Sequence, residues 1–266
     1  MINLEKHLET LGPFKPQCIK EAQQTWMHYR GMYDFQTYQP ILTSPSANEK
    51  MAKGDSLNYG LALAPARSSA LANVCNHSTP GCRESCVAYS GNGNYPLVQR
   101  ARDCRTAFAA GSPEMFGTLV DAEIGMASHK HHPTPVHVRL NQFSDIRWER
   151  HFPWMFEHTT VQFYDYTKWP VHMRANVPDN YHLTFSYSGE RPRRVYLQGT
   201  NVAVVFDTKR GDPLPSEWVL PTEVVPRKVV DGDVDDNRYD DEAGVIVGLR
   251  AKGKAQRDTT GFVVAQ

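Results

Sequence analysis

The chain has 266 residues, and its 29 Lys and Arg residues balance 29 Asp and Glu residues, so the formal net charge is zero. Proteins whose main task is to wrap duplex DNA carry a basic surplus, and this composition therefore does not favour that class. A chain of this length buries enough surface to fold without disulfides. It has five cysteines, three of which lie within one stretch of twelve residues.

The sequence carries no signal for export or for membrane insertion. The N-terminal residues include Glu5, Lys6 and Glu9 and lack the apolar core of a signal peptide. No stretch approaches the roughly 20 apolar residues that a membrane-spanning helix needs. We therefore expect a cytoplasmic protein without a membrane partner. In such a reducing compartment, clustered cysteines are more often metal ligands or catalysts than disulfides.

Residues 1–55 are predicted to form an N-terminal helical extension followed by a loop. A helical pattern covers Cys18–Tyr29 after Pro16, and residues 40–55 are rich in Ser, Pro, Asn and Gly. Cys18 has no second cysteine nearby, and we expect it to be buried as a small apolar side chain.

Residues 56–266 are predicted to form a βα domain. Six segments have the alternating or continuous apolar pattern of strands: Tyr59–Ala64, Val136–Leu140, Thr160–Tyr164, Tyr181–Phe185, Val202–Phe206 and Val245–Leu249. Helical segments are predicted between the earlier strands: Pro96–Ala110, Pro113–Ser128, Trp148–His158 and Val171–Val177. The first of these helices places Cys104 on its core face. This alternation predicts an α/β fold with a partial (β/α)6 TIM-like barrel.

Polar residues follow several of the predicted strands. Asn141 and Asp145 follow the second strand, Asp165 and Lys168 follow the third, and Ser186 follows the fourth. In a βα barrel the chemistry gathers at the carboxyl ends of the strands. We therefore expect Asp145, Asp165 and Lys168 to position substrate or transfer protons, and Asn141 and Ser186 to contact a cofactor.

The clustered cysteines have the spacing C-x6-C-x3-C, with Cys75, Cys82 and Cys86. Pro80 and Gly81 supply a turn that brings Cys82 back toward Cys75. Three thiolates can hold a 4Fe–4S cluster and leave one iron open for a substrate or cofactor. They can also hold zinc, with His77 or a distant residue as fourth ligand. Spacing alone does not decide between the two metals.

The position of the cysteines, after the first strand of a six-strand βα series, resembles the layout of the radical S-adenosylmethionine enzymes. Those enzymes hold an iron–sulfur cluster in a loop at the same place of a partial (β/α)6 barrel. The spacing here differs from their usual C-x3-C-x2-C, and Asn141–Asp145 stands where they carry a glycine-glycine-glutamate motif. The resemblance implies an iron–sulfur cluster and S-adenosylmethionine as a cofactor.

A second resemblance covers the chain from about Leu57 to the C-terminus. The stretches ANVCNHSTPGCRESC, HVRLNQFSDIRWE, VQFYDYTK and GVIVGLRAKGKA are similar to those of an uncharacterised family of bacteriophage proteins. The resemblance implies that Cys75, Cys82 and Cys86 match the cysteine positions of that family. It also implies that the protein acts in an infected host cell, which makes a nucleotide or a nucleic acid base the expected substrate.

Two further motifs are charged segments near the C-terminus. The acidic run that begins at Asp231 has calcium-loop spacing, but Asp236 stands where such a loop needs glycine, and a solvated loop is the simpler interpretation. The basic runs Arg191–Arg194 and Arg250–Lys254 could hold phosphates or form a solvated face.

The sequence therefore leaves three functional hypotheses open. The first is an iron–sulfur enzyme, similar to the radical S-adenosylmethionine enzymes, acting on a nucleotide or base. The second is a zinc-containing base-exchange enzyme, similar to transglycosylases, with an aspartate as nucleophile. The third is a zinc-stabilised nucleic-acid-binding protein without catalysis, used in phage replication or host takeover.

Overall fold

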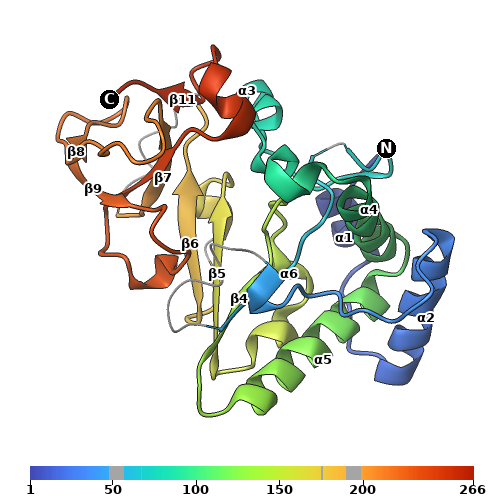
Figure 1. The fold of residues 1–266 in the computed structure, drawn as a ribbon. Coiled ribbons are helices and arrows are strands. Elements are labelled where there is room, and N and C mark those ends of the chain that lie inside the picture. Colours follow the sequence, from blue (N-terminus) through green and yellow to red (C-terminus); the bar gives the residue numbers. More distant parts are fainter. Residues whose placement is uncertain (48–56, 67, 175, 190–198) are drawn as a thin grey trace.

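The fold was analysed in a computed structural model, which describes residues 1–47, 57–66, 68–174, 176–189 and 199–266 (Figure 1). The helices are α1 (Leu4–Leu11), α2 (Ile19–Met32), α3 (Pro80–Glu84), α4 (Pro96–Gly111), α5 (Pro113–His131) and α6 (Trp148–His151). Short 3₁₀ turns lie between the helices and strands and include Pro153–Phe156 and Val171–Arg174.

The strands form one large, mostly parallel sheet and one small parallel pair. The pair consists of β1 (Ile2–Asn3) and β3 (Ala72–Asn73). The large sheet contains β2 (Leu57–Gly60), β4 (Val136–Arg139), β5 (Val161–Thr167), β6 (Tyr181–Ser186), β7 (Val202–Phe206), β8 (Glu217–Trp218), β9 (Arg227–Asp231), β10 (Ile246–Arg250) and β11 (Val263–Val264). Its order is β2-β4-β5-β6-β7-β10-β9-β8, with β11 beside β7, and among the described strands only β8 and β9 pair antiparallel.

The six predicted strands occupy successive positions in this sheet. They correspond to β2, β4, β5, β6, β7 and β10, and every neighbouring pair among them is parallel. The prediction of a mixed α/β fold built on a parallel sheet is therefore confirmed. The strand pairing of the described residues runs from β2 at one edge to β8 at the other without closing on itself. Barrel closure stays a prediction.

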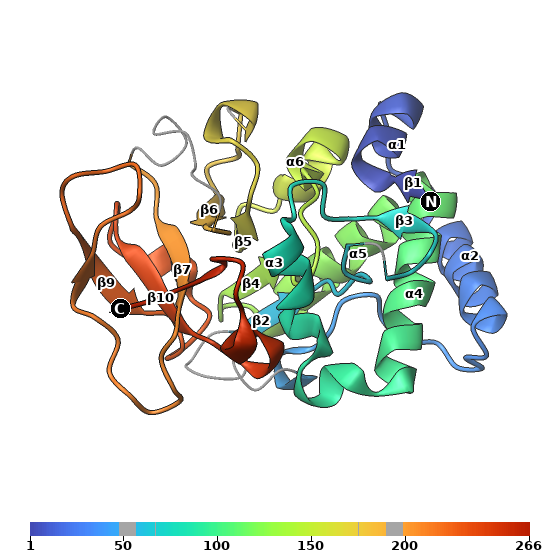
Figure 2. The ribbon, with the colours of Figure 1, turned by 90° about the horizontal axis from the view of Figure 1, so that it is seen from above.

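The C-terminal strand β11 enters the sheet where β6 and β7 diverge. β6 pairs with the start of β7, at Val202 and Ala203, whereas β11 pairs with the end of β7, at Val205 and Phe206. Figure 2, seen from above, shows the C-terminal segment beside α3, and the two are neighbours in Figure 1 as well. Because of this pairing, the last ten residues reach the carboxyl ends of the central strands.

One face of the sheet packs against α5, which packs in turn against α2 and α4, and together they form the main hydrophobic core. Alternate residues of the strands, such as Val138 and Phe163, point into it and are fully buried. Leu4 of α1 and Trp26 of α2 belong to the same core. The N-terminal helices therefore share one core with the sheet, and the division at residues 55 and 56 stays a prediction.

The opposite face of β4 and β5 is polar although it is buried. Tyr164 Oη donates hydrogen bonds to Asn58 Oδ1 at 3.1 Å and to Asp236 Oδ2 at 3.3 Å, and Arg139 pairs with the same Asp236 oxygen at 2.8 Å. Tyr239 lies against His137, with 3.0 Å between its hydroxyl and Nδ1. The acidic run of the sequence thus folds partly inward and covers this face.

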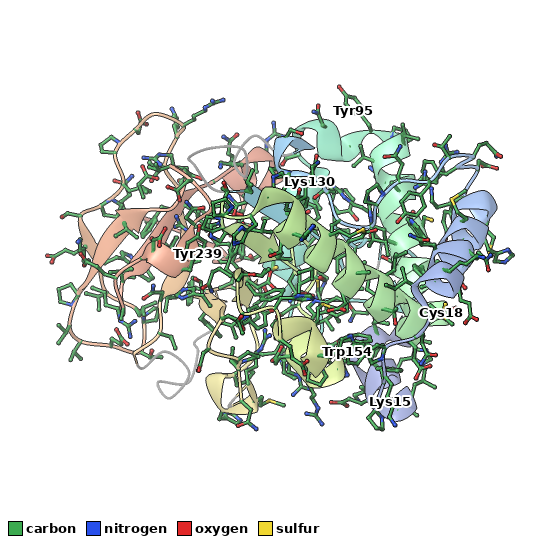
Figure 3. The ribbon with its side chains drawn as sticks, turned by 90° about the horizontal axis from the view of Figure 1, so that it is seen from below. Lys15, Cys18, Tyr95, Lys130, Trp154 and Tyr239 are labelled. Carbon is green, nitrogen blue, oxygen red and sulfur yellow. The ribbon has the colours of Figure 1, made fainter. Side chains whose placement is uncertain are left out.

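The predicted helices and strands agree with the structure to within a few residues, with two kinds of exception. Cys18 was expected to be buried, and this was wrong: it is exposed, because it occupies the N-cap of α2, outside the packed face of the helix (Figure 3). Cys104 is 1% exposed, as predicted. The helix expected over Val171–Val177 is a single 3₁₀ turn, and the one expected over Trp148–His158 is the short α6 followed by the 3₁₀ turn Pro153–Phe156. α1 lies in the N-terminal extension that was predicted to be helical, but no bounds had been predicted for it.

Candidate functional site

The cysteine loop lies against the segment that follows β4. Cys75 Sγ donates a hydrogen bond to the carbonyl oxygen of Phe143 at 3.3 Å. One residue earlier, the carbonyl of Val74 accepts the backbone N–H of Asp145 at 2.9 Å. Both partners lie just beyond the carboxyl end of β4. The first cysteine is thus placed at the edge of the parallel sheet where α/β proteins collect their functional groups.

The next two cysteines are positioned by the short helix α3. Thr79 is its N-cap and accepts the N–H of Cys82 at 3.2 Å, and Pro80 occupies the first turn, where the missing N–H costs nothing. Thr79 Oγ1 also donates to the carbonyl of Ser188, just beyond β6. These contacts join the cysteine loop to the ends of both β4 and β6.

The C-terminal segment packs tightly on α3. A Cβ atom on Gly81 would lie 2.0 Å from Thr260 Oγ1 and 2.9 Å from Phe262 Cβ. Glycine is required here by close approach rather than by backbone conformation. Phe262 in turn lies near Lys168, with 5.9 Å between Nζ and the ring centre. The C-terminus therefore forms one wall of the site.

The three thiols are close enough to influence one another electrostatically. Burial raises the pKa of Cys75 above its ordinary value, and the nearby carboxyl of Asp145 and the thiols of Cys86 and Cys82 raise it further. Burial also raises the pKa of Cys86. As free groups, these two are therefore neutral thiols at neutral pH, and a metal would have to displace their protons.

Two positively charged side chains oppose the rise in the pKa of Cys86. Arg102 of α4 and Lys168, beyond β5, both act to lower its pKa. The Arg102 guanidinium is 6% exposed, donates to the carbonyl of Ala88 at 2.8 Å and lies 4.4 Å above the Phe143 ring. Buried positive charge next to three cysteines favours an anionic occupant of the cysteine loop.

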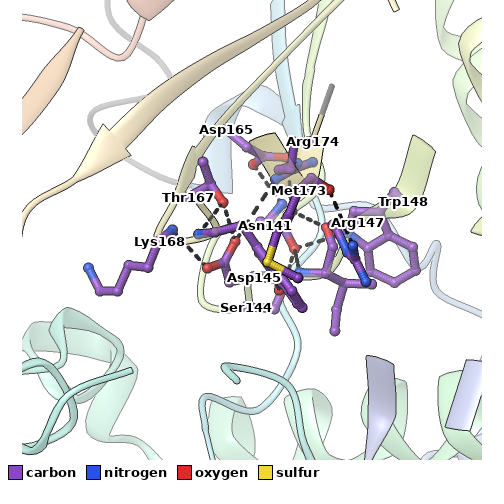
Figure 4. Close-up of polar contacts among 12 residues, drawn as sticks. Asn141, Ser144, Asp145, Arg147, Trp148, Asp165, Thr167, Lys168, Met173 and Arg174 are labelled. Carbon is purple, nitrogen blue, oxygen red and sulfur yellow. Dashed lines mark hydrogen bonds and ion pairs between the residues drawn. The ribbon is translucent and has the colours of Figure 1, made fainter. Parts of the chain in front are cut away.

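Lys168 reaches from the end of β5 to the end of β6. Its Nζ donates to Ser186 Oγ at 2.6 Å and to the Ser186 carbonyl at 3.2 Å. Figure 4 shows its side chain pointing away from the cluster of polar groups around Asp145. Among the predicted catalytic residues, Lys168 acts to lower the pKa of Cys86, whereas the Asp145 carboxyl acts to raise the pKa of Cys75.

Asp145 holds the backbone at the end of β5. Its two carboxylate oxygens accept the Thr167 hydroxyl and the Lys168 backbone N–H, each at 2.8 Å. Arg174 lies 4.0 Å from the carboxylate, and burial raises the pKa of Asp145. The geometry makes Asp145 a residue that fixes the turn from which the Lys168 side chain leaves.

Asp165 and Asn141 belong to a second buried network (Figure 4). Asp165 is fully buried and accepts the backbone N–H of Asn141 at 2.7 Å and the Tyr181 hydroxyl at 2.7 Å. Burial raises its pKa to about 7. The side-chain amide oxygen of Asn141, Oδ1, accepts the Ile146 N–H at 3.0 Å and the Trp148 indole N–H at 3.0 Å. These contacts tie the ends of β4 and β5 together.

The predicted site residues therefore divide into two groups. The three cysteines, Lys168 and Ser186 come together at the carboxyl ends of β4, β5 and β6. Asn141, Asp145 and Asp165 lie beside them, but their polar atoms are bound within the protein. The roles predicted for all of them in catalysis and cofactor binding stay predictions.

No group of three or more His, Cys, Asp or Glu side chains in the described part of the chain is arranged to hold one metal ion. His77, the residue considered as a fourth zinc ligand, packs its ring edge on Trp169 with 4.2 Å between the ring centres. Arg147 lies over the same indole at 3.9 Å. His77 is thus held by aromatic packing.

Two residues of the site were not identified from the sequence. Arg102 lies on a helix among other charged residues, and nothing in its spacing marks it as a neighbour of Cys86. Phe262 lies more than 170 residues after the cysteines, and only the pairing of β11 with β7 brings it back. Neither position has a local signal.

The charged runs near the C-terminus are largely paired with each other. Arg250 lies 2.8 Å from Asp231, and Lys252 lies 2.7 Å from Asp233. These ion pairs reduce the positive charge that the basic run could offer to phosphates. The other basic run, Arg191–Arg194, lies outside the described residues.

Comparison with known proteins identifies the family. Neither the curated proteins nor the solved structures contain a match to this chain. None of the helices among the described residues is long and apolar enough to span a membrane. A family model described as gene product 88 matches residues 40–266. This match begins earlier than the resemblance noted from about Leu57, and it confirms the prediction of a phage protein family. The chain belongs to the gene product 88 family of phage-type proteins.

Proposed function

We propose that this protein is an iron–sulfur enzyme that acts on a nucleotide or a nucleic acid base during phage infection. One observation carries the proposal: the thiols of Cys75, Cys82 and Cys86 lie with the buried Arg102 and with Lys168 at the carboxyl ends of three parallel strands. In parallel α/β folds this edge is where ligands bind.

The charge of the surroundings supports a cluster. Three thiolates on a 4Fe–4S core leave the whole group anionic, and Arg102 and Lys168 are the cations that act on Cys86. The Arg102 side chain is held in place by the Ala88 carbonyl and the Phe143 ring, so its charge cannot move away.

The choice between a cluster and a single zinc ion depends on how closely the thiolates must approach one another. With Zn–S bonds of roughly 2.3 Å, thiolates on one zinc lie within about 4 Å of each other. The described side chains contain no group so arranged, so a single zinc ion would require the thiols to move together. A cluster would bind its thiolates on separate irons, and both metals stay proposals.

In this proposal the chain's own groups hold and orient a ligand at the open iron. A bound cluster would supply an iron able to bind and reduce a cofactor, and S-adenosylmethionine is the candidate from the resemblance to radical enzymes. Lys168 and its hydrogen-bond partner Ser186 would contact the cofactor or substrate, since the charge of Lys168 acts on Cys86. Asp145 positions Lys168 by holding its backbone N–H.

Electron paramagnetic resonance of the reduced, anaerobically purified protein tests this proposal. A cluster signal that changes when S-adenosylmethionine is added would support an open iron that binds this cofactor. A cluster signal that does not change would refute S-adenosylmethionine binding while leaving the cluster. A protein that contains zinc and gives no signal would refute the iron–sulfur proposal.

A further inference from the structure

A pocket of about 220 Å³ lies on the helix-covered side of β5 and β6, across the sheet from Lys168 and Ser186. It exists because the connection from β5 to β6 contains only the 3₁₀ turn Val171–Arg174 where a full helix was expected. The shorter turn leaves the side chains of Leu183 and Phe185 incompletely covered.

The walls of this pocket are mostly aromatic and aliphatic. Trp169, Tyr181 and Phe185 supply aromatic faces, and Val177 and Leu183 complete the apolar lining. A cavity of about 150 Å³ holds one benzene ring, and pockets for drug-sized ligands begin near roughly 300 Å³. The volume therefore suits one substituted six-membered ring.

Arg174 provides the polar group of this pocket. Its side chain is 2% exposed, and Nε and Nη2 are bound to Glu149 at 2.9 and 2.7 Å. Nη1 is buried and has no hydrogen-bond acceptor, because the Asp145 carboxylate lies 4.0 Å away, beyond hydrogen-bond reach. A buried donor without an acceptor is costly, and a ligand oxygen would satisfy it.

The charged groups around Arg174 determine whether a ligand oxygen bound to Nη1 would be anionic or neutral. Glu149 and Asp145 both act to raise the pKa of the Arg174 guanidinium, and the charge of Arg174 in turn acts to lower the pKa of the buried Asp165 carboxyl. Since one arginine already has several carboxyl partners, a ligand anion would be repelled. A neutral carbonyl oxygen accepts the Nη1 hydrogen bond without adding charge.

We propose that this pocket binds an uncharged six-membered ring bearing a carbonyl group, such as a pyrimidine base. The choice of a nucleobase among such rings rests on the proposed function, whereas the pocket and its free donor do not. Trp169 forms a wall of the pocket and also contacts His77 of the cysteine loop, so one side chain connects the pocket with that loop.

Calorimetric titration of the full chain with thymidine, benzamide, benzoate and toluene tests this assignment. Thymidine and benzamide, which carry a neutral carbonyl, should bind at least tenfold more tightly than benzoate or toluene. Val177→Phe, which places a larger side chain in the wall of the pocket, should weaken thymidine binding at least tenfold. Val224→Phe, at a residue that is 89% exposed, is the matched control and should not change it.

The outcomes separate this inference from the proposed function. Thymidine binding that survives Val177→Phe, or that is no tighter than benzoate binding, would overturn the pocket assignment whatever the metal content. Cys75→Ala should abolish iron binding and leave thymidine binding intact. A Val177→Phe protein that retains iron but not thymidine affinity would confirm that the two sites are independent.

Discussion

The carboxylate of Asp145 accepts the backbone N–H of Lys168 at 2.8 Å, while the Lys168 side chain leaves in another direction and reaches Ser186. One residue thus fixes the main chain from which the other presents its charge to the cysteine loop. Asp165 supports the main chain in the same way, because its buried carboxylate accepts the backbone N–H of Asn141.

Asp145→Asn is expected to lower the free energy of unfolding by roughly 1–3 kcal/mol. The amide replaces one acceptor oxygen by an NH₂ group, which leaves either the Thr167 hydroxyl or the Lys168 N–H without its buried partner. Urea unfolding followed by circular dichroism would measure the change. Ser46→Ala, at an exposed position, is the control. An Asp145→Asn protein as stable as the wild type would show that the carboxylate does not hold this turn.

Glu123 is expected to make the protein more stable at pH 5.5 than at pH 8. Burial raises its pKa to about 7, although it accepts the N–H groups of Ile41 and Leu42. Between about pH 4.5 and about pH 7, the Glu123 carboxyl keeps its proton in the folded state and loses it in the unfolded state. The free energy of unfolding therefore falls as the pH rises through this range. Asp165, with its pKa also raised to about 7, acts in the same direction.

The comparison with Glu123→Gln isolates the contribution of this one group. The glutamine does not titrate, so the stability of the wild type relative to the variant should fall by up to roughly 3 kcal/mol from pH 4.5 to pH 8. Urea unfolding of both proteins across this range measures it. A difference that stays constant with pH would mean that Glu123 is ionised throughout.

Gly81→Ala is expected to destabilise the packing of α3 against the C-terminal segment by roughly 1–3 kcal/mol. The added methyl would lie 2.0 Å from Thr260 Oγ1. Thr260→Ala removes that atom, so the double variant should regain part of the stability that Gly81→Ala loses. A double-mutant cycle by thermal or urea unfolding checks this, and purely additive effects would contradict the contact.

Much of the fold could be predicted from the sequence because the strands are strongly patterned. Val202–Phe206 is a continuous apolar run and forms a strand with the expected bounds. Cys104 at helical spacing is buried as expected. The pairing of β11 with β7, by contrast, depends on the divergence of β6 and β7, which no local pattern encodes.

The sequence predicted which residues belong to the candidate site, but it did not predict toward which side of the sheet each side chain points. The third strand was expected to end at Tyr164, which placed Asp165 in a loop facing the site, whereas β5 continues to Thr167. Alternation along the longer strand turns Asp165 and Thr167 toward the helix-covered side. Cys18 was expected to be buried because a free cysteine usually packs as a small apolar side chain, but it is the N-cap residue of α2 and is exposed.

Metal content and the absorption spectrum of anaerobically purified protein test the central claim most directly. The proposal predicts a brown protein with about four irons per chain and absorption near roughly 400 nm, as expected of a 4Fe–4S cluster. Cys82→Ala should lose both, whereas Cys104→Ala, at a buried cysteine outside the cluster, should keep them. A colourless wild-type protein, with one zinc per chain or with no metal, would contradict the proposed iron–sulfur site.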